Sequence, residues 1–162
     1  MRLNLYEIID RPGGICPFSY ALDVSGLVTP QISAVSPLRV DGQVKNRAGI
    51  LELSATARAD MTCVCDRCAR AYPIHAAFPI NVRLAESGEE SGEVFLLKEG
   101  GFLELDEVLN TAFVLYLPAK FLCGEDCRGL CPKCGADLNS GPCGCGRDID
   151  LRWAALGGLL ED

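Results

Sequence analysis

The sequence has 162 residues, a formal net charge of −7 and an apolar fraction of 49%. This length fits one domain with room for a small appendage, and the apolar content excludes global disorder. The longest uncharged, mostly apolar stretch, residues 108–119, is too short to span a bilayer. Glu7 interrupts the first apolar segment before a signal-peptide core could form. We therefore expect a cytoplasmic protein without a membrane partner.

The strongest local pattern lies in residues 51–63, where apolar side chains occupy every odd position and polar side chains every even one. Strict alternation over this length predicts a half-buried strand with one solvent-facing side. Residues 39–45, followed by a short loop at 46–49, are predicted to form its antiparallel partner. The first 37 residues give only a short apolar segment and a turn at residues 11–14.

The same alternation returns in residues 74–84, with His75, Asn81 and Arg83 predicted to face solvent. Pro79 lacks an amide donor, which predicts a sheet edge or a bulge at that point. Residues 94–97 form another short predicted strand. Residues 105–117 change to helical spacing, with Asp106 as the predicted N-cap and Pro118 as the stop.

These elements predict an α+β fold: a mainly antiparallel β-sheet with a packed helix and a C-terminal cysteine-rich zinc-binding segment. We expect residues 1–118 to form a β-rich body with one helix. Residues 119–162 would form a zinc-ribbon-like tail packed on that body, with one or two helical turns at residues 150–156.

Charge is unevenly distributed along the chain. Eight acids between Glu86 and Glu107 are opposed only by Lys98, while residues 39–83 carry a modest surplus of bases. The acidic stretch is either a solvated loop or a docking strip for a basic partner. The basic surplus is well below the footprint of a typical nucleic-acid binder.

Ten cysteines and a single histidine are the most unusual feature of the composition. In a reducing compartment, closely spaced cysteines are metal ligands more often than disulfides. Cys16 has no cysteine neighbour, and strand parity places Cys63 in the core. The predicted metal ligands are the remaining eight: Cys65, Cys68, Cys123, Cys127, Cys131, Cys134, Cys143 and Cys145.

Eight thiolates suffice for two tetrahedral sites, and two pairings are possible. In the first, Cys131 and Cys134 join the 143/145 pair, while Cys65 and Cys68 join the 123/127 pair. The second exchanges the 131/134 and 65/68 pairs between the sites, and spacing alone does not choose between them. All-thiolate sites are normally closed and structural, which predicts one or two structural zinc ions, although such sites also accept iron.

The sequence offers little for catalysis. His75 has no evident nucleophile partner, no Gly-rich phosphate loop is present, and the Pro-Cys-x-Cys spacing at 142–145 is wrong for a zinc deaminase. We therefore expect a non-enzymatic protein without a small-molecule substrate.

The ordered combination of motifs resembles the YceD family, whose members are described as large ribosomal RNA subunit accumulation proteins. The resemblance runs from about residue 39 to the C-terminus, and the first 37 residues match only loosely. The residues that carry it are 65–69, 105–107, 117–118, Cys123, 127–135, 138–139, 143–145 and 150–156.

The resemblance implies a cytoplasmic, non-enzymatic factor for ribosome assembly that binds ribosomal RNA or a basic ribosomal protein. It supplies no catalytic residues. The alternative suggested by the clustered thiols is a redox sensor or a zinc-switch chaperone, which would lose its metal under mild oxidation.

Overall fold

Two fifteen-residue strands form the centre of the structure, a computed structural model that describes residues 1–27, 29–85, 94–98 and 100–145. In chain order the elements are β1 (Arg2–Asn4), α1 (Tyr6–Ile9), β2 (Ile15–Leu22), η1 (Ser25–Leu27), β3 (Ile32–Val35), β4 (Leu38–Arg47), β5 (Ile50–Val64), β6 (Ala71–Ala85), β7 (Val94–Leu96), β8 (Phe102–Glu104) and α2 (Leu105–Tyr116). None of the described helices is long and apolar enough to cross a membrane.

Within the described residues the main sheet has six strands. Its order is β2–β4–β5–β6–β7, and β3 pairs with β5 near residues 61–63. All pairings are antiparallel except that of β7 with β6. A separate two-stranded sheet joins β1 to β8. The predicted mainly antiparallel sheet is therefore confirmed.

The alternation predicted for residues 51–63 is present in β5, where every odd residue from Leu51 to Cys63 is buried. β4 is its antiparallel partner, with Arg39 opposite Arg58 and Arg47 opposite Ile50. β6 repeats the pattern, and His75, Asn81 and Arg83 are exposed as predicted. On the side away from β5, Pro79 has no paired strand among the described residues, because β7 pairs only with residues 83–85. The sheet edge predicted at Pro79 is therefore present.

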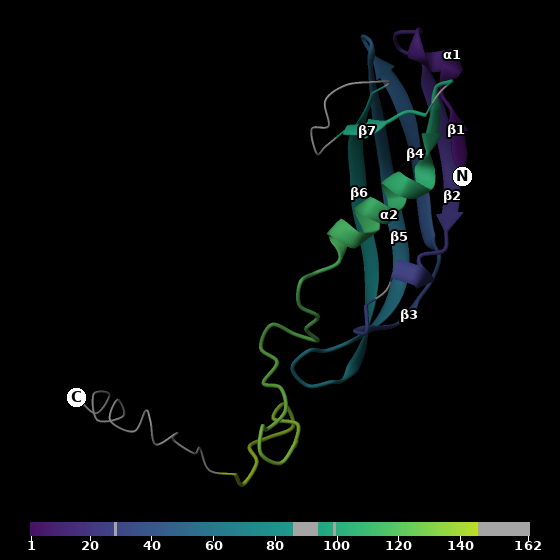
Figure 1. Ribbon diagram of the computed structural model, residues 1–162. Helices are drawn as coiled ribbons and strands as arrows, with labels where there is room; N and C mark the ends of the chain where they lie inside the picture. Colours follow the sequence, from purple (N-terminus) through teal and green to yellow (C-terminus); the bar gives the residue numbers. More distant parts are fainter. Residues whose placement is uncertain (28, 86–93, 99, 146–162) are drawn as a thin grey trace, which may run out of the picture.

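Helix α2 lies across the inner face of the sheet (Figure 1). Its residues Val108, Leu109 and Phe113 are fully buried in the core. Tyr116, at the end of the helix, stacks on Phe78 of β6 with ring centroids 4.2 Å apart. The prediction that Asp106 is the N-cap is wrong. The helix begins at Leu105 with Glu104 as the cap residue, and the Asp106 carboxylate instead accepts a hydrogen bond from the N-terminal amino group.

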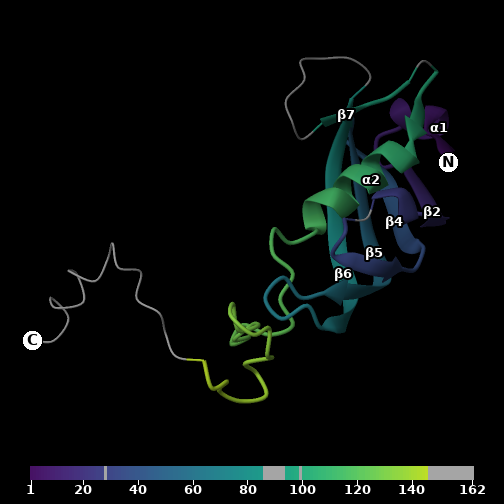
Figure 2. The same ribbon diagram turned by 60° about the horizontal axis from the view of Figure 1, so that its bottom comes forward.

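After α2 the chain leaves the sheet. Both ribbon views place residues 117–145 beyond one end of the strands, next to the loop that connects β5 to β6 (Figures 1 and 2). Residues 65–70 form this loop, and we call it the β5–β6 loop. The helical turns predicted for residues 150–156 lie outside the described residues. So does most of the acidic stretch, namely Glu86, Glu89, Glu90, Glu93 and Glu99.

Asn46 is the one buried polar side chain in the described core, with an exposed fraction of 1%. Its amide group donates to the carbonyl oxygens of Ile8 and Ile9, and its side-chain oxygen accepts from the Gly49 amide at 2.8 Å. Asn46 thus fastens helix α1 to the turn between β4 and β5. Buried polar groups of this kind are costly when their partners are removed.

We predict that Asn46→Ala lowers the free energy of unfolding by about 1–3 kcal/mol, because two carbonyls and one amide lose their partner inside the protein. Chemical denaturation followed by circular dichroism measures this change. Gln43→Ala, at an exposed position of the same strand, is the control and should stay within about 0.5 kcal/mol of wild type. Equal stability of the two variants would contradict the role given to Asn46.

Candidate metal centres

The first cysteine group joins two distant parts of the chain. Cys65 and Cys68 lie in the β5–β6 loop, and Cys123 and Cys127 lie in the segment after α2; we call these four the first tetrad. All four sulfur atoms lie within 4.8 Å of one another. Three of the side chains are buried and Cys123 is half-buried.

The sulfur spacing in the first tetrad suits a tetrahedral ion. Cys65 Sγ is 3.8 Å from Cys127 Sγ, and Cys68 Sγ is 3.6 Å from Cys123 Sγ. Zinc–sulfur bonds of about 2.3 Å in a regular tetrahedron place the sulfurs about 3.8 Å apart. A disulfide needs about 2.05 Å, so these distances are those of free thiols around a cation-sized space. The residues therefore fit a structural zinc ion.

Contacts outside the sulfurs hold the two halves of the first tetrad together. Asp66 accepts from the Phe121 amide at 2.7 Å through its carboxylate and donates its own amide to the Phe121 carbonyl at 2.8 Å. The Arg67 guanidinium donates to the Cys127 carbonyl at 2.9 Å. Tyr72 and Leu122 pack against the buried sulfurs. The β5–β6 loop is thus tied to residues 121–127 by backbone and side chain alike.

The second cysteine group is local in sequence. Cys131, Cys134, Cys143 and Cys145 lie within 4.8 Å of one another by their sulfur atoms, and we call them the second tetrad. Cys131 is buried, Cys143 is half-buried and Cys134 is exposed. As in the first tetrad, the four sulfurs are close enough to share a tetrahedral ion. The second tetrad, however, lies within fifteen consecutive residues, whereas the first joins segments far apart in the sequence.

Each tetrad contains a Cys-x-x-Cys turn with the same backbone form. The Ala69 amide donates to the Cys65 carbonyl at 2.9 Å, and the Gly135 amide donates to the Cys131 carbonyl at 2.8 Å. The residue that follows the second cysteine has a left-handed backbone in both turns, with φ of 55° at Ala69 and 72° at Gly135. This conformation costs glycine nothing and costs alanine about 1 kcal/mol or more.

The two tetrads are linked through the residues between them. The Leu130 amide donates to the Arg67 carbonyl at 3.1 Å, and Arg70 forms an ion pair of 2.6 Å with Asp137. The Asn139 side-chain amide donates to Cys127 Sγ at 3.5 Å. Gly129 permits this close approach, because a Cβ at its position would lie 2.9 Å from the Arg67 carbonyl oxygen.

Hydrogen bonds give the thiols of each tetrad very different acidities. Burial raises the pKa of Cys65, but the amides of Cys123, Cys68 and Arg67 donate to its sulfur and bring that pKa down to about 6. Hydrogen bonds with the Cys68 and Cys127 sulfurs, together with burial, raise the pKa of Cys123 to about 12.

The second tetrad repeats this contrast. Amides of Cys134 and Lys133, and then the Cys143 side chain, lower the pKa of Cys131 to about 6. A hydrogen bond with Cys134, followed by burial, raises the pKa of Cys145 to about 12. Each tetrad therefore holds one readily ionised thiol and one that keeps its proton until a cation supplies the balancing charge.

All eight predicted ligands are thus brought together in two groups, and the grouping is that of the first of the two pairings derived from spacing. Metal ligation by these residues stays a prediction. Cys63 belongs to the main core with no exposed surface, and Cys16 is half-buried against that core. Neither belongs to a tetrad.

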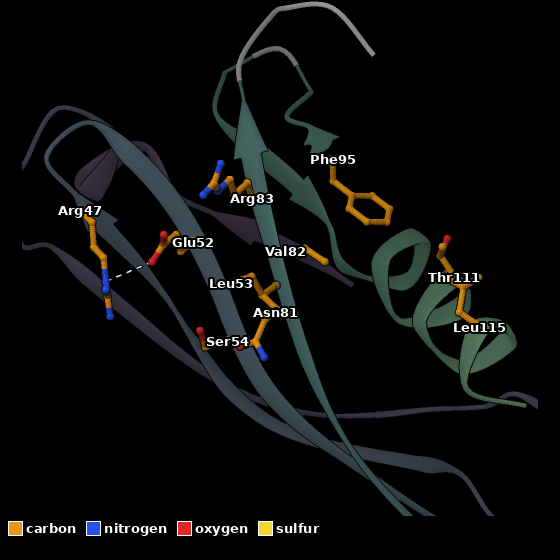
Figure 3. A pocket seen from close by; sticks show the side chains of 10 residues that line it. All are labelled: Arg47, Glu52, Leu53, Ser54, Asn81, Val82, Arg83, Phe95, Thr111 and Leu115. Carbon is orange, nitrogen blue, oxygen red and sulfur yellow. Dashed lines mark ion pairs between the residues drawn. The ribbon is translucent and has the colours of Figure 1, made fainter. Parts of the chain in front are cut away.

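A groove of about 690 Å³ runs beside β6 and α2 (Figure 3). Among its lining residues, Arg47 and Glu52 form an ion pair of 3.0 Å at one end, and Phe95 and Leu115 lie toward the helix at the other. His75 lies elsewhere, exposed on the outer face of the sheet and 2.7 Å from Asp60. The described lining residues of the groove include no cysteine or histidine.

Residues 53–160 match the family model described as large ribosomal RNA subunit accumulation protein YceD. The chain belongs to the YceD family. The matched range contains both tetrads of this YceD-family chain, together with β6, α2 and most of β5. No solved structure matches it.

Several curated relatives are similar to parts of this YceD-family chain. An uncharacterised protein of Mycobacterium tuberculosis is 41% identical over 58 residues, which cover 36% of the chain and 28% of the relative. An uncharacterised Mycobacterium leprae protein is 27% identical over 93% of the chain and 73% of its own length. A chloroplastic Arabidopsis thaliana protein, named large ribosomal RNA subunit accumulation protein YCED homolog 1, is 46% identical over 25% of the chain and 13% of the relative. The chain thus spans little more than a quarter of the first of these relatives.

We predict that the reduced, purified chain binds about two Zn²⁺ ions, one in each tetrad. The double variant Cys65→Ser/Cys123→Ser removes two ligands from the first tetrad only, so it should keep about one ion. Cys65→Ser/Cys131→Ser disables both tetrads and should keep none. Elemental analysis of the purified protein measures the ratio, with Cys16→Ser as a control that keeps both ions. Complete metal loss in Cys65→Ser/Cys123→Ser would favour the second pairing.

We predict opposite effects from substitutions at Ala69 and Gly135, the two left-handed residues that follow the Cys-x-x-Cys turns. Gly135→Ala should weaken zinc binding by the second tetrad about fivefold, since the backbone strain costs about 1 kcal/mol. The added Cβ meets no heavy atom within 4 Å, so the effect is purely conformational. Ala69→Gly should strengthen binding by the first tetrad by a similar factor. Competition with a chromophoric chelator measures both changes.

Gly144→Ala is the matched control for this comparison. Gly144 lies between two cysteines of the second tetrad, has no positive φ, and has equally open space around its Cβ position. Its substitution should leave the zinc affinity unchanged. Equal weakening by Gly135→Ala and Gly144→Ala would show that bulk near the metal, rather than backbone strain, is responsible.

Proposed function

We propose that this protein is a non-enzymatic, zinc-stabilised factor that supports the accumulation of large-subunit ribosomal RNA and hence ribosome assembly. The observation that carries the proposal is the family match over residues 53–160, which contains both tetrads. The family description and the name of the Arabidopsis relative both refer to accumulation of large-subunit ribosomal RNA. Neither of them refers to a reaction.

Zinc has a structural role in this proposal. An ion in the first tetrad would fasten the segment after α2 to the end of the sheet, and an ion in the second would shape residues 131–145. Four thiolates leave no open coordination position for a substrate or a reactive water, which is typical of structural rather than catalytic zinc. Residues 1–118 then form the body of the protein and residues 119–162 its metal-shaped tail.

The partner is ribosomal RNA or a basic ribosomal protein in the cytoplasm. Bases close to the tetrads favour phosphate, and the acidic sequence from Glu86 to Glu107 favours a basic protein. The two differ in their response to salt, because contact with the RNA backbone releases counterions and weakens steeply as salt rises. Titration of binding against salt therefore distinguishes them.

The alternative function, a thiol-based redox sensor or zinc-switch chaperone, requires thiols that oxidants can reach. Cys134 is exposed, whereas three of the four thiols in the first tetrad are buried. This observation favours redox behaviour for the second tetrad alone.

We predict that cells lacking this protein contain less large-subunit ribosomal RNA relative to small-subunit RNA, and that the wild-type chain restores the ratio. A Cys65→Ser/Cys123→Ser chain should fail to restore it, because the tail is no longer held against the sheet. Cys16→Ser should restore it fully. Gel quantification of the two RNAs, with immunoblots to compare protein levels, measures the outcome. An unchanged RNA ratio in the deletion strain would refute the proposed function.

A further inference from the structure

We propose that the second tetrad is an oxidant-responsive site that releases its metal and forms a disulfide through Cys134, while the first tetrad stays intact. This inference rests on the part of the proposed function in which both tetrads hold zinc. It goes beyond that function by assigning different chemistry to two groups with identical ligands. The oxidant that forms the disulfide in this proposal is a peroxide.

Access to the sulfurs is the first difference between the tetrads. Cys134 is exposed, whereas in the first tetrad Cys65, Cys68 and Cys127 are buried and Cys123 is half-buried. Oxidation of cysteine follows the thiolate character and the exposure of the sulfur. A zinc-bound sulfur is a thiolate in either tetrad, so exposure decides which tetrad reacts first.

The surrounding contacts are the second difference. The sulfurs of the first tetrad lie beneath Tyr72 and Leu122, and Asn139 donates to Cys127 Sγ at 3.5 Å. Opening this tetrad would also disturb the hydrogen bonds that Asp66 and Arg67 form with residues 121–127. The cysteines of the second tetrad all lie in residues 131–145. The hydrogen bonds that Asp66 and Arg67 form with residues 121–127 do not involve that segment, so its rearrangement leaves them in place.

The spacing of the second tetrad allows a disulfide without movement of the body. All four of its sulfurs, those of Cys134 and Cys145 included, lie within 4.8 Å of one another. A disulfide requires about 2.05 Å between sulfurs, so a shift of a few ångströms within this short segment is sufficient.

The chemistry balances as a two-electron oxidation. The Cys134 thiolate attacks one peroxide oxygen, the O–O bond breaks, and a sulfenic acid and hydroxide form. The Cys145 thiolate then attacks the Cys134 sulfur, the S–O bond breaks, a disulfide forms, and a second hydroxide leaves. Two protons convert the hydroxides to water. The loss of two thiolate ligands releases the zinc ion.

The test uses the full reduced chain loaded with Zn²⁺ and treated with hydrogen peroxide. A chromophoric chelator records metal release, and alkylation at timed points followed by mass spectrometry records which thiols remain. We expect one equivalent of zinc to leave roughly tenfold or more faster than the second. Over the same period Cys134 and Cys145 should lose alkylation while the first tetrad keeps it. A dithiol reductant should restore both thiols and zinc binding.

Three further samples distinguish the possible outcomes. Cys134→Ser removes the proposed point of attack and one partner of the disulfide, so zinc release from the second tetrad should slow and no disulfide to Cys134 can form. Cys16→Ser should react like wild type. Metal-free protein reports the order of thiol oxidation independently of zinc.

Loss of first-tetrad thiols before or together with those of the second would overturn this inference. Failure of the purified chain to bind zinc would instead refute the metal part of the proposed function, and the order of alkylation would still be measured.

Discussion

The contact between the β5–β6 loop and residues 121–127 determines how the two parts of this protein are joined. Two long strands run to the end of the sheet and present Cys65 and Cys68 there, and α2 then carries the chain back to the same end. Asp66 and Phe121 form two hydrogen bonds, one through the Asp66 amide and one through its carboxylate. These bonds fix how residues 121–127 are aligned against the β5–β6 loop. The four sulfurs converge because this alignment holds, and metal binding would reinforce an arrangement that the chain already favours.

The sequence predicts the central sheet well because its strands are long and one face of the sheet is exposed to solvent, so polar and apolar residues alternate along each strand. Strict alternation over residues 51–63, almost the whole of β5, leaves no competing interpretation. The sequence does not predict β2, because its exposed positions include the apolar residues Ile15 and Ala21, which hide the alternation. β3 has only four residues, too few to show a period. Asp106 has the residue type of an N-cap, but the helix begins at the buried Leu105, so the cap lies two residues earlier, at Glu104.

The sequence singles out the eight cysteines of the two tetrads, but it does not determine how they are grouped. Cys-x-x-Cys spacing indicates which two sulfurs of one turn can share an ion, but it does not indicate which pairs of cysteines come together in the fold. That depends on the length of α2 and on the direction in which it crosses the sheet. The left-handed backbone after each Cys-x-x-Cys turn could be predicted at position 135, where the residue is glycine. It could not be predicted at Ala69, because alanine rarely adopts this conformation.

The same local contacts limit the surface that could meet a nucleic acid. Arg67 and Arg70 lie beside the first tetrad, where Arg67 donates to the Cys127 carbonyl and Arg70 pairs with Asp137. Both guanidiniums are therefore committed to holding the tail. Lys120 and Arg128 form no ion pair with other described residues and remain candidates for contact with phosphate. Two such bases give a weak electrostatic footprint. A partner that binds the tail tightly must therefore recognise its shape as well as its charge.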